Sequence, residues 1–267
     1  MHDWRDWLIR HRVTVAVAIV AAATGAGGTA LALPASSSPH VVSLPVAGRT
    51  QAALKVTSGT PVLDISVARL DGTLLRVSTP SGAPVRPVLS GSRLILLSLV
   101  GDAAAPGNAS AADQKNGYAV NVVLSSAVTW SIDLAGGTQR TDVDLRRGKV
   151  AGIEVTAGTD ILDVSLPRPA GTVPFLFAGG ASQFQLSLPG GVPAQVIAAA
   201  GAGYLTVDGQ SLTVVAGGTV LATSGWATAR SRFDIDATAG VSWLTVIRWL
   251  STATMECHIL HYRWVYL

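Results

Sequence analysis

The chain has 267 residues, of which 49% are hydrophobic and only 13% charged, so it is long enough for one large domain or two small ones and carries about half the usual density of charge. Its net charge of +3 is weak, and the arginines after residue 40 are scattered apart from the Arg146–Arg147 pair. Nucleic-acid binding, which requires a basic stripe with interleaved aromatic residues, is therefore excluded, and the single cysteine, Cys257, excludes an intrachain disulfide.

The first predicted element is a transmembrane helix over residues 13–33, after a cytoplasmic N-terminus over residues 1–12. The segment has no charged side chain and is long enough to cross a bilayer as a helix. Three arginines precede it and the next cation is Arg49, so we expect a single-pass protein of the cell membrane whose C-terminal domain is extracytoplasmic. A cleaved signal peptide is the alternative, because residues 30–32 read Ala-Leu-Ala. The anchor is favoured because the apolar run is longer than a usual signal core.

Residues 34–40, rich in serine and proline, form a predicted linker, and residues 41–249 a predicted β domain. In residues 62–67, VLDISV, apolar and polar side chains alternate with the period of a strand. Turns rich in Gly, Pro, Asp and Ser separate similar runs. Strands are predicted at 54–57, 62–67, 74–78, 94–100, 118–124, 129–134, 141–145, 153–156, 161–166, 173–177, 183–188, 195–199, 204–207, 212–215, 219–223, 233–237 and 243–248.

A glycine-led pattern, Gly-x-x-x-apolar-x-apolar, recurs within this domain. It begins at Gly137, Gly158, Gly180 and Gly201, and its period of 21 or 22 residues suits one coil of a stacked β structure. We interpret the glycines as coil corners that require a positive φ. The pattern predicts a single-stranded β-solenoid, similar to a parallel β-helix, in which successive coils stack along an axis and their inward aliphatic rows form one core.

A longer repeat indicates duplication within the same domain. Residues 54–73 and 153–172 are identical at ten of twenty positions without a gap. Residues 101–117 are small, polar and without periodicity, which predicts a mobile loop between two halves. Residues 250–267 differ abruptly in composition, with five aromatic or histidine residues in HILHYRWVYL, and form either a capping element or a tail foreign to the fold.

Carboxylates are the candidate catalytic groups, because no histidine occurs between residues 41 and 257 and a Ser-His-Asp arrangement in the β domain is excluded. Asp142, Asp160, Asp163 and Glu154 fall on neighbouring predicted coils. Asp142 and Asp163 are expected to point outward in register, about 5 Å apart. A solvated charged face that opposes association is the favoured interpretation. A carbohydrate-active site built from Asp142, Asp160 and Asp163 is the alternative.

A candidate metal site lies in the C-terminal tail. Glu256, Cys257, His258 and His261 have the chemistry of ligands, and Cys257 and His261 would share one face of a helix. The cluster has no distant fourth ligand, which a structural metal site would require. Calcium binding by the carboxylates would lack the Gly-Gly-x-Gly-x-Asp repeat, and no phosphate-binding loop is present. No cofactor is therefore expected.

Three segments combine a glycine turn with alternating apolar residues: VTAGTDILDVSLP, AGAGYLTVDG and DATAGVSWLTVIRW. Together with the N-terminal anchor they resemble the adhesin-head-like domains of unknown function in bacterial envelope proteins, of the actinobacterial type. The resemblance covers about residues 41–249, and the chain departs from it in the 101–117 loop and after Trp249. It implies an extracytoplasmic, non-catalytic β-solenoid, with no ligand residues to transfer.

We therefore expect a membrane-anchored, extracytoplasmic and non-catalytic module for adhesion, surface attachment or envelope sensing. Its working parts would be the outer faces of the stacked strands, and its partner an envelope polymer or a surface protein. A carbohydrate-active envelope enzyme is the alternative, and it requires Asp142, Asp160 and Asp163 to converge within about 10 Å around a groove. A metal-responsive tail over residues 250–267 is a third hypothesis.

Overall fold

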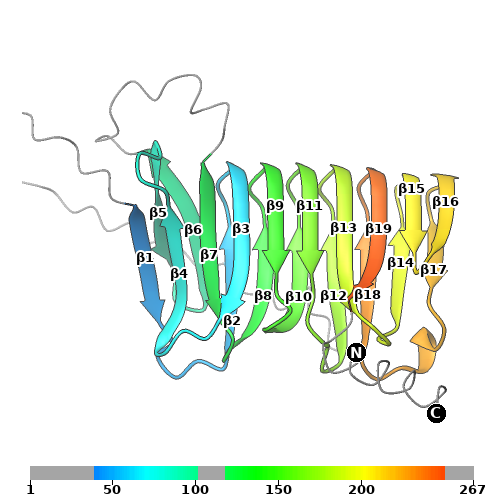
Figure 1. The fold of residues 1–267 in the computed structure, drawn as a ribbon, viewed down its shortest axis with the longest axis horizontal. Coiled ribbons are helices and arrows are strands. Elements are labelled where there is room, and N and C mark those ends of the chain that lie inside the picture. Colours follow the sequence, from blue (N-terminus) through cyan, green and yellow to red (C-terminus); the bar gives the residue numbers. More distant parts are fainter. Residues whose placement is uncertain (1–38, 102–117, 250–267) are drawn as a thin grey trace, which may run out of the picture. The chain divides into compact units, whose positions relative to one another are not determined.

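A computed structural model describes residues 39–101 and 118–249, and the backbone in both ranges consists largely of β-strands (Figure 1). The prediction of a mainly β domain is confirmed. One short 3-10 helix, Trp226–Thr228, interrupts the strands in these ranges. No helix in this part of the chain is long and apolar enough to span a membrane. The described residues do not include the predicted membrane segment at 13–33, nearly all of the predicted loop at 101–117, or the tail at 250–267.

The strands are numbered in chain order. They are β1 (His40–Pro45), β2 (Gln51–Val56), β3 (Thr60–Ala68), β4 (Thr73–Thr79), β5 (Val85–Ser90), β6 (Leu94–Gly101), β7 (Ala119–Ser125), β8 (Thr129–Leu134), β9 (Thr138–Asp144), β10 (Lys149–Val155), β11 (Thr159–Ser165), β12 (Thr172–Phe177), β13 (Ala181–Pro189), β14 (Ala194–Ala198), β15 (Ala202–Val207), β16 (Gln210–Val215), β17 (Thr219–Ala222), β18 (Arg232–Ala237) and β19 (Val241–Trp249). The sequence pattern did not predict β5, because Pro87 interrupts it. Proline lacks the N–H that a central strand needs, and β5 is an edge strand.

The strands form two mixed sheets. Sheet A has ten strands in the order β1-β4-β7-β3-β9-β11-β13-β19-β15-β16, and sheet B has nine in the order β17-β14-β18-β12-β10-β8-β2-β6-β5. Pairing is parallel through the middle of both sheets, from β7 to β15 in sheet A and from β14 to β6 in sheet B. It is antiparallel at both ends, where β1, β4, β5, β16 and β17 lie.

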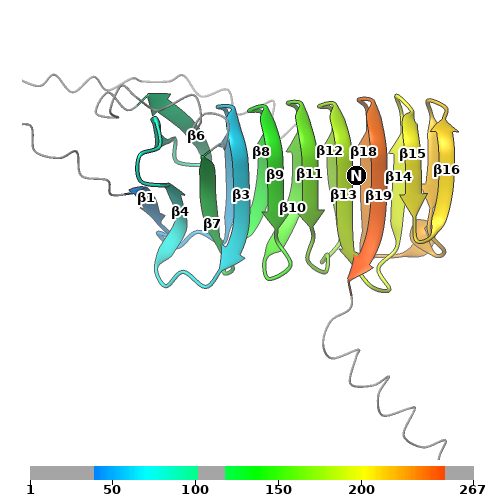
Figure 2. The same cartoon turned by 45° about the horizontal axis from the view of Figure 1, so that its top comes forward.

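The central strands alternate between the two sheets as the chain proceeds. β8, β10 and β12 lie side by side in sheet B, and β9, β11 and β13 lie side by side in sheet A (Figure 2). In sheet A the register places Asp142 beside Asp163 and Asp163 beside Gln185. These partners are 21 and 22 residues apart, so the glycine-led period corresponds to one step from a strand to its parallel neighbour in the same sheet.

The order of the strands differs from the predicted succession of coils. β13 pairs with β19 and not with β15, so the unit that begins at Gly201 does not follow the unit that begins at Gly180. The reason is that β16 and β17 turn back antiparallel at the end of the sheets, after which the chain returns and inserts β18 and β19. Similarly, β3 pairs with β9, while β4, β6 and β7 lie on the other side of the β2–β3 unit.

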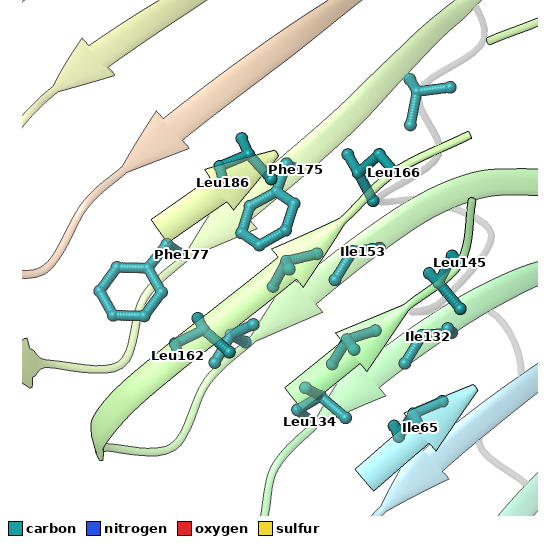
Figure 3. Close-up of a cluster of buried hydrophobic side chains, with 14 of the residues drawn as sticks. Ile65, Ile132, Leu134, Leu145, Ile153, Leu162, Leu166, Phe175, Phe177 and Leu186 are labelled. Atoms are coloured by element: carbon teal, nitrogen blue, oxygen red, sulfur yellow. The ribbon is translucent and has the colours of Figure 1, made fainter. Parts of the chain in front are cut away.

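Alternate side chains of the two sheets fill one core. Leu54 and Ile235 of sheet B are almost completely buried. Ile132 and Ile153 of sheet B are buried as well, together with the alternating aliphatic residues of sheet A such as Leu162 (Figure 3). Phe184 of sheet A stacks on Phe175 and Phe177 of sheet B, with ring centroids 5.3 and 5.0 Å apart. Each such side chain stabilises the fold by about 1.5–3 kcal/mol when fully buried. The strand-period alternation of the sequence thus determines which residues lie inside.

The glycines at the corners between sheets are required for close backbone packing. Gly201 has a positive φ of 82°, as interpreted from the sequence, whereas Gly137, Gly158 and Gly180 do not, which corrects the interpretation at those three positions. Before Gly137 and Gly180, it is the preceding glycine whose missing side chain matters. A Cβ on Gly136 would collide with the carbonyl oxygen of Ser58, and a Cβ on Gly179 with that of Ala157. At these two corners the backbones of neighbouring units therefore lie in contact, with no room for a side chain on Gly136 or Gly179.

Candidate binding surface

The outer face of sheet A carries the side chains that alternate with the core residues. One row of them runs in register from β3 to β16, at the strand spacing of about 4.8 Å. We call this the polar row; it consists of Asp64, Asp142, Asp163, Gln185, Thr245, Thr206 and Ser211. The prediction that Asp142 and Asp163 lie in register on adjacent strands is confirmed. Asp64 was missed, although the long repeat aligns it with Asp163.

Arg140 bridges two of the predicted carboxylates, Asp142 and Asp163. The Arg140 guanidinium donates to Asp163 Oδ2 over 2.8 Å and lies 3.9 Å from Asp142 Oδ2. All three side chains are partly exposed. Burial raises the pKa of the Asp142 carboxyl above its usual value, the carboxylates of Asp163 and Asp64 raise it further, and Arg140 lowers it. The ionised form of Asp142 is therefore disfavoured in the folded protein.

The remaining predicted carboxylates lie elsewhere. Asp160 is exposed near the start of β11, three residues or roughly 10 Å along the strand from Asp163. Glu154 belongs to β10 in sheet B, so it is not on the face that carries Asp142. Because Arg140 bridges the only two that meet, this arrangement is an ion-pair network on an outer face. It gives the carbohydrate-active enzyme hypothesis no support.

A second ion pair borders the carboxylates. Arg146 donates from Nε to Asp144 Oδ1 over 2.9 Å and from Nη2 to Asp144 Oδ2 over 2.6 Å, a bidentate arrangement. The Arg146 backbone N–H also donates to Asp144 Oδ1. These hydrogen bonds hold the pKa of Asp144 below its usual value. The positive charge of Arg146 thus neutralises the acidic end of β9.

Two aromatic side chains stack beside the polar row. Trp243 of β19 and Tyr204 of β15 are in register, with ring centroids 3.9 Å apart and 10° between the ring planes. They are 51% and 42% exposed, which is unusual for such large apolar side chains. Gln183 of β13 lies on the other side of Trp243 in the same cross-strand row. Exposed Trp and Tyr are the residues most often found at the energetic centre of a binding interface.

The aromatic pair was missed because its two strands were not expected to be neighbours. A signal for it does exist in the sequence. Tyr204 and Trp243 occupy the same position of the glycine-led pattern, in GAGYLTV and GVSWLTV, three residues after Gly201 and Gly240. Equivalent positions in adjacent strands form a ladder, so the alignment would predict the contact once β15 is known to pair with β19.

On the outer face of sheet B the charged side chains of Lys55 and Arg232 contact other groups of the same chain. Lys55 donates to Asp133 Oδ2 over 2.6 Å, and the Arg232 guanidinium lies 4.5 Å from the Trp226 ring while it donates to the carbonyl oxygens of Trp226 and Ala227. Among the described residues, no group of three or more His, Cys, Asp and Glu side chains could hold a metal ion. The candidate ligands Cys257, His258 and His261 lie outside the described residues.

Comparison with solved structures finds the same fold in a "putative cell adhesion protein" from Clostridium sporogenes, with a TM-score of 0.60 and 18% identity over 79% of this chain and 99% of that one. A "putative adhesin" from Parabacteroides merdae matches with a TM-score of 0.22 and 9% identity over 58% of this chain and 70% of that one. A "putative adhesin" from Bacteroides fragilis matches with a TM-score of 0.25 and 10% identity over 80% of this chain and 99% of that one. Both TM-scores are too low to establish a common fold. No family model and no curated protein matches the chain. The chain thus has an adhesin-like β fold.

Proposed function

We propose that this chain is a non-catalytic adhesion or surface-binding module that contacts its partner through the outer face of sheet A. The observation that carries the proposal is the stacked, half-exposed Trp243–Tyr204 pair next to the polar row. Rigid aromatic side chains contribute large contact areas at little entropic cost, and the Asp, Gln and Thr side chains of the row add hydrogen-bonding groups around them. The likeness in fold to the Clostridium sporogenes protein supports the same function.

The architecture suits a function exerted by an extended surface. We propose that the units β8–β9, β10–β11 and β12–β13 are coils of a short β-solenoid, since each repeats the register of the previous one in both sheets. Such a repeat presents rows of side chains at a fixed spacing, which fits a polymer or an extended protein segment better than a small molecule. The partner is then an envelope polymer or a surface protein.

The chain acts, in this proposal, on the outer side of the cell membrane, held by residues 13–33 and with residues 1–12 in the cytoplasm. The support is the uncharged segment between Arg12 and Arg49. Protease treatment of intact cells should remove an epitope placed after Trp249 and leave one placed at the N-terminus. Loss of both epitopes only after lysis would contradict this topology.

The binding proposal is tested with the full chain in detergent micelles and insoluble bacterial cell envelopes. Trp243→Ala should weaken cosedimentation by about tenfold or more, as expected for a residue at the centre of an interface. Val41→Ala is the matched control, because Val41 is also an exposed apolar residue on the outer face of sheet A. Protease treatment of the envelopes distinguishes a protein partner from a polymer. Equal binding by Trp243→Ala and the wild type would refute the proposal.

A further inference from the structure

The two ends of the sheets are protected differently. β1 contains Pro45, and β5 contains Arg86 and Pro87; β5 also contacts β1 and β4 across the core. At the opposite end, β16 and β17 contain neither a charged residue nor a proline. These two strands also do not pack against each other across the core in the way that β5 packs against β1 and β4. Edge strands without charge or proline are free to pair with another strand, and proteins normally protect them.

The core is open at the β16 end. Leu212 lies directly opposite Leu205, so its side chain points to the core side of sheet A. Leu205 is fully buried, whereas Leu212 is 38% exposed because no strand lies beyond it in the described part of the chain. Val214 at the end of the same strand is 90% exposed. An apolar edge of this kind gains free energy when another strand covers it.

The backbone of β16 is also ready to pair. Asp208 and Gly209 have φ angles of 49° and 84°, which makes the β15–β16 connection a two-residue type I′ turn closed by Val207 and Gln210. Hydrogen-bonded and non-hydrogen-bonded pairs alternate in an antiparallel ladder, so Gln210 and Leu212 bond to β15. Ser211 and Thr213 consequently direct their N–H and C=O groups to the outer edge.

We propose that two copies of this chain join edge to edge, with β16 of each copy paired antiparallel to β16 of the other about a twofold axis at Leu212. Ser211 of each copy then faces Thr213 of the other. Each of these two pairs exchanges two backbone hydrogen bonds, so four N–H···O=C bonds form in total. Leu212 faces Leu212 of the second copy in the closest type of pair. Sheet A of one molecule continues into sheet A of the other.

A second copy fits this edge because β16 is complementary to itself. In the paired arrangement its hydroxyl side chains, Ser211 and Thr213, meet on the outer face, and its leucines meet on the core side, where they close the open ends of two cores. No like charges face each other. A twofold pairing uses the β16 edge of both copies, so the assembly is closed at two copies and does not grow into a fibre through this edge.

A disulfide between the two leucine positions tests the geometry. In the full chain with Cys257→Ser, in native membranes, Leu212→Cys should form a covalent dimer on mild oxidation, because the Cα separation of about 4.5 Å in such a pair suits a disulfide. Val88→Cys is the control, since Val88 is also 38% exposed and lies on the edge strand at the opposite end. No dimer for Leu212→Cys, or a cross-link to another protein, overturns the proposal.

A charge exchange separates loss of pairing from loss of folding. Leu212→Lys and Leu212→Glu should each abolish co-purification of two differently tagged full-length copies, because like charges would lie directly opposite. Co-expression of the Lys copy with the Glu copy should restore it, which a misfolded variant could not do. Co-purification that persists in Leu212→Lys alone, or that the mixed pair fails to restore, would show that the copies do not join at β16.

Discussion

The indole of Trp243 lies parallel to the ring of Tyr204 on the outer face of sheet A, although β19 and β15 are not consecutive in the chain. Insertion of β19 between β13 and β15 creates this contact. The same insertion aligns Thr245 with Thr206, so one topological feature produces both the aromatic pair and part of the polar row.

The two rings are expected to stabilise each other. Trp243→Ala and Tyr204→Ala, combined in a double-mutant cycle, should give a coupling free energy of about 0.5–1.5 kcal/mol, the range measured for stacked aromatic pairs. Chemical denaturation of the four full-length proteins measures it. Additive effects of the two substitutions would mean that the stacking contributes nothing to stability.

Asp142 and Asp144, two residues apart on β9, should respond oppositely to pH. The folded state raises the pKa of Asp142 above its usual 3.8, so the stabilisation from protonation is present at low pH and is lost as pH rises through the folded-state pKa. Asp142→Asn should therefore raise the melting temperature near pH 7 and leave it almost unchanged below pH 3.8.

The pKa of Asp144 is lowered, so its contribution is present above pH 3.8 and is lost as pH falls through the folded-state value. Asp144→Asn should lower the melting temperature near pH 7, with the difference from the wild type disappearing in acid. Melting curves of both variants from pH 3 to pH 7 provide the measurement. Shifts of the same sign at pH 7 would contradict the assigned electrostatics.

Gly179→Ala should destabilise the fold by about 1–3 kcal/mol, because the new Cβ would press on the carbonyl oxygen of Ala157 and the stacked corners would have to separate. Gly171→Ala is the matched control. No atom lies within 4 Å of its Cβ position and its φ angle is not positive. Urea denaturation midpoints of the two variants should differ clearly, and equal midpoints would exclude corner stacking as the reason for glycine.

Lys55→Ala should destabilise the protein by about 1–3 kcal/mol, because it leaves the Asp133 carboxylate largely buried without its cation. Asp133 Oδ1 already has no hydrogen-bond partner among the described residues. The double variant Lys55→Met, Asp133→Leu should recover most of the loss, since no buried charge remains. Arg69→Ala, which removes an ion pair with Asp71 that is exposed on both sides, is the control and should have almost no effect.

The alternation of residues along single strands was sufficient to predict several features of the fold. In residues 62–67 it identified the inward leucine, isoleucine and valine, and the 21-residue spacing identified Asp142 and Asp163 as lateral neighbours. Both depend on local geometry, namely the two-residue period of a strand and the constant length of one unit. Pro87 concealed β5 because an edge strand tolerates a residue that a central strand excludes.

By itself the sequence determined that the domain is β, which side chains lie inside, and the length of the unit that repeats. Only the tertiary structure decided the order in which these units lie side by side, and with it the meeting of Trp243 with Tyr204 and the exposure of β16 at one end. The physical reason is that every unit offers similar edges and a similar apolar face. Local patterns therefore cannot distinguish the possible neighbours, which are selected by the antiparallel turns at the ends and by packing across the whole core.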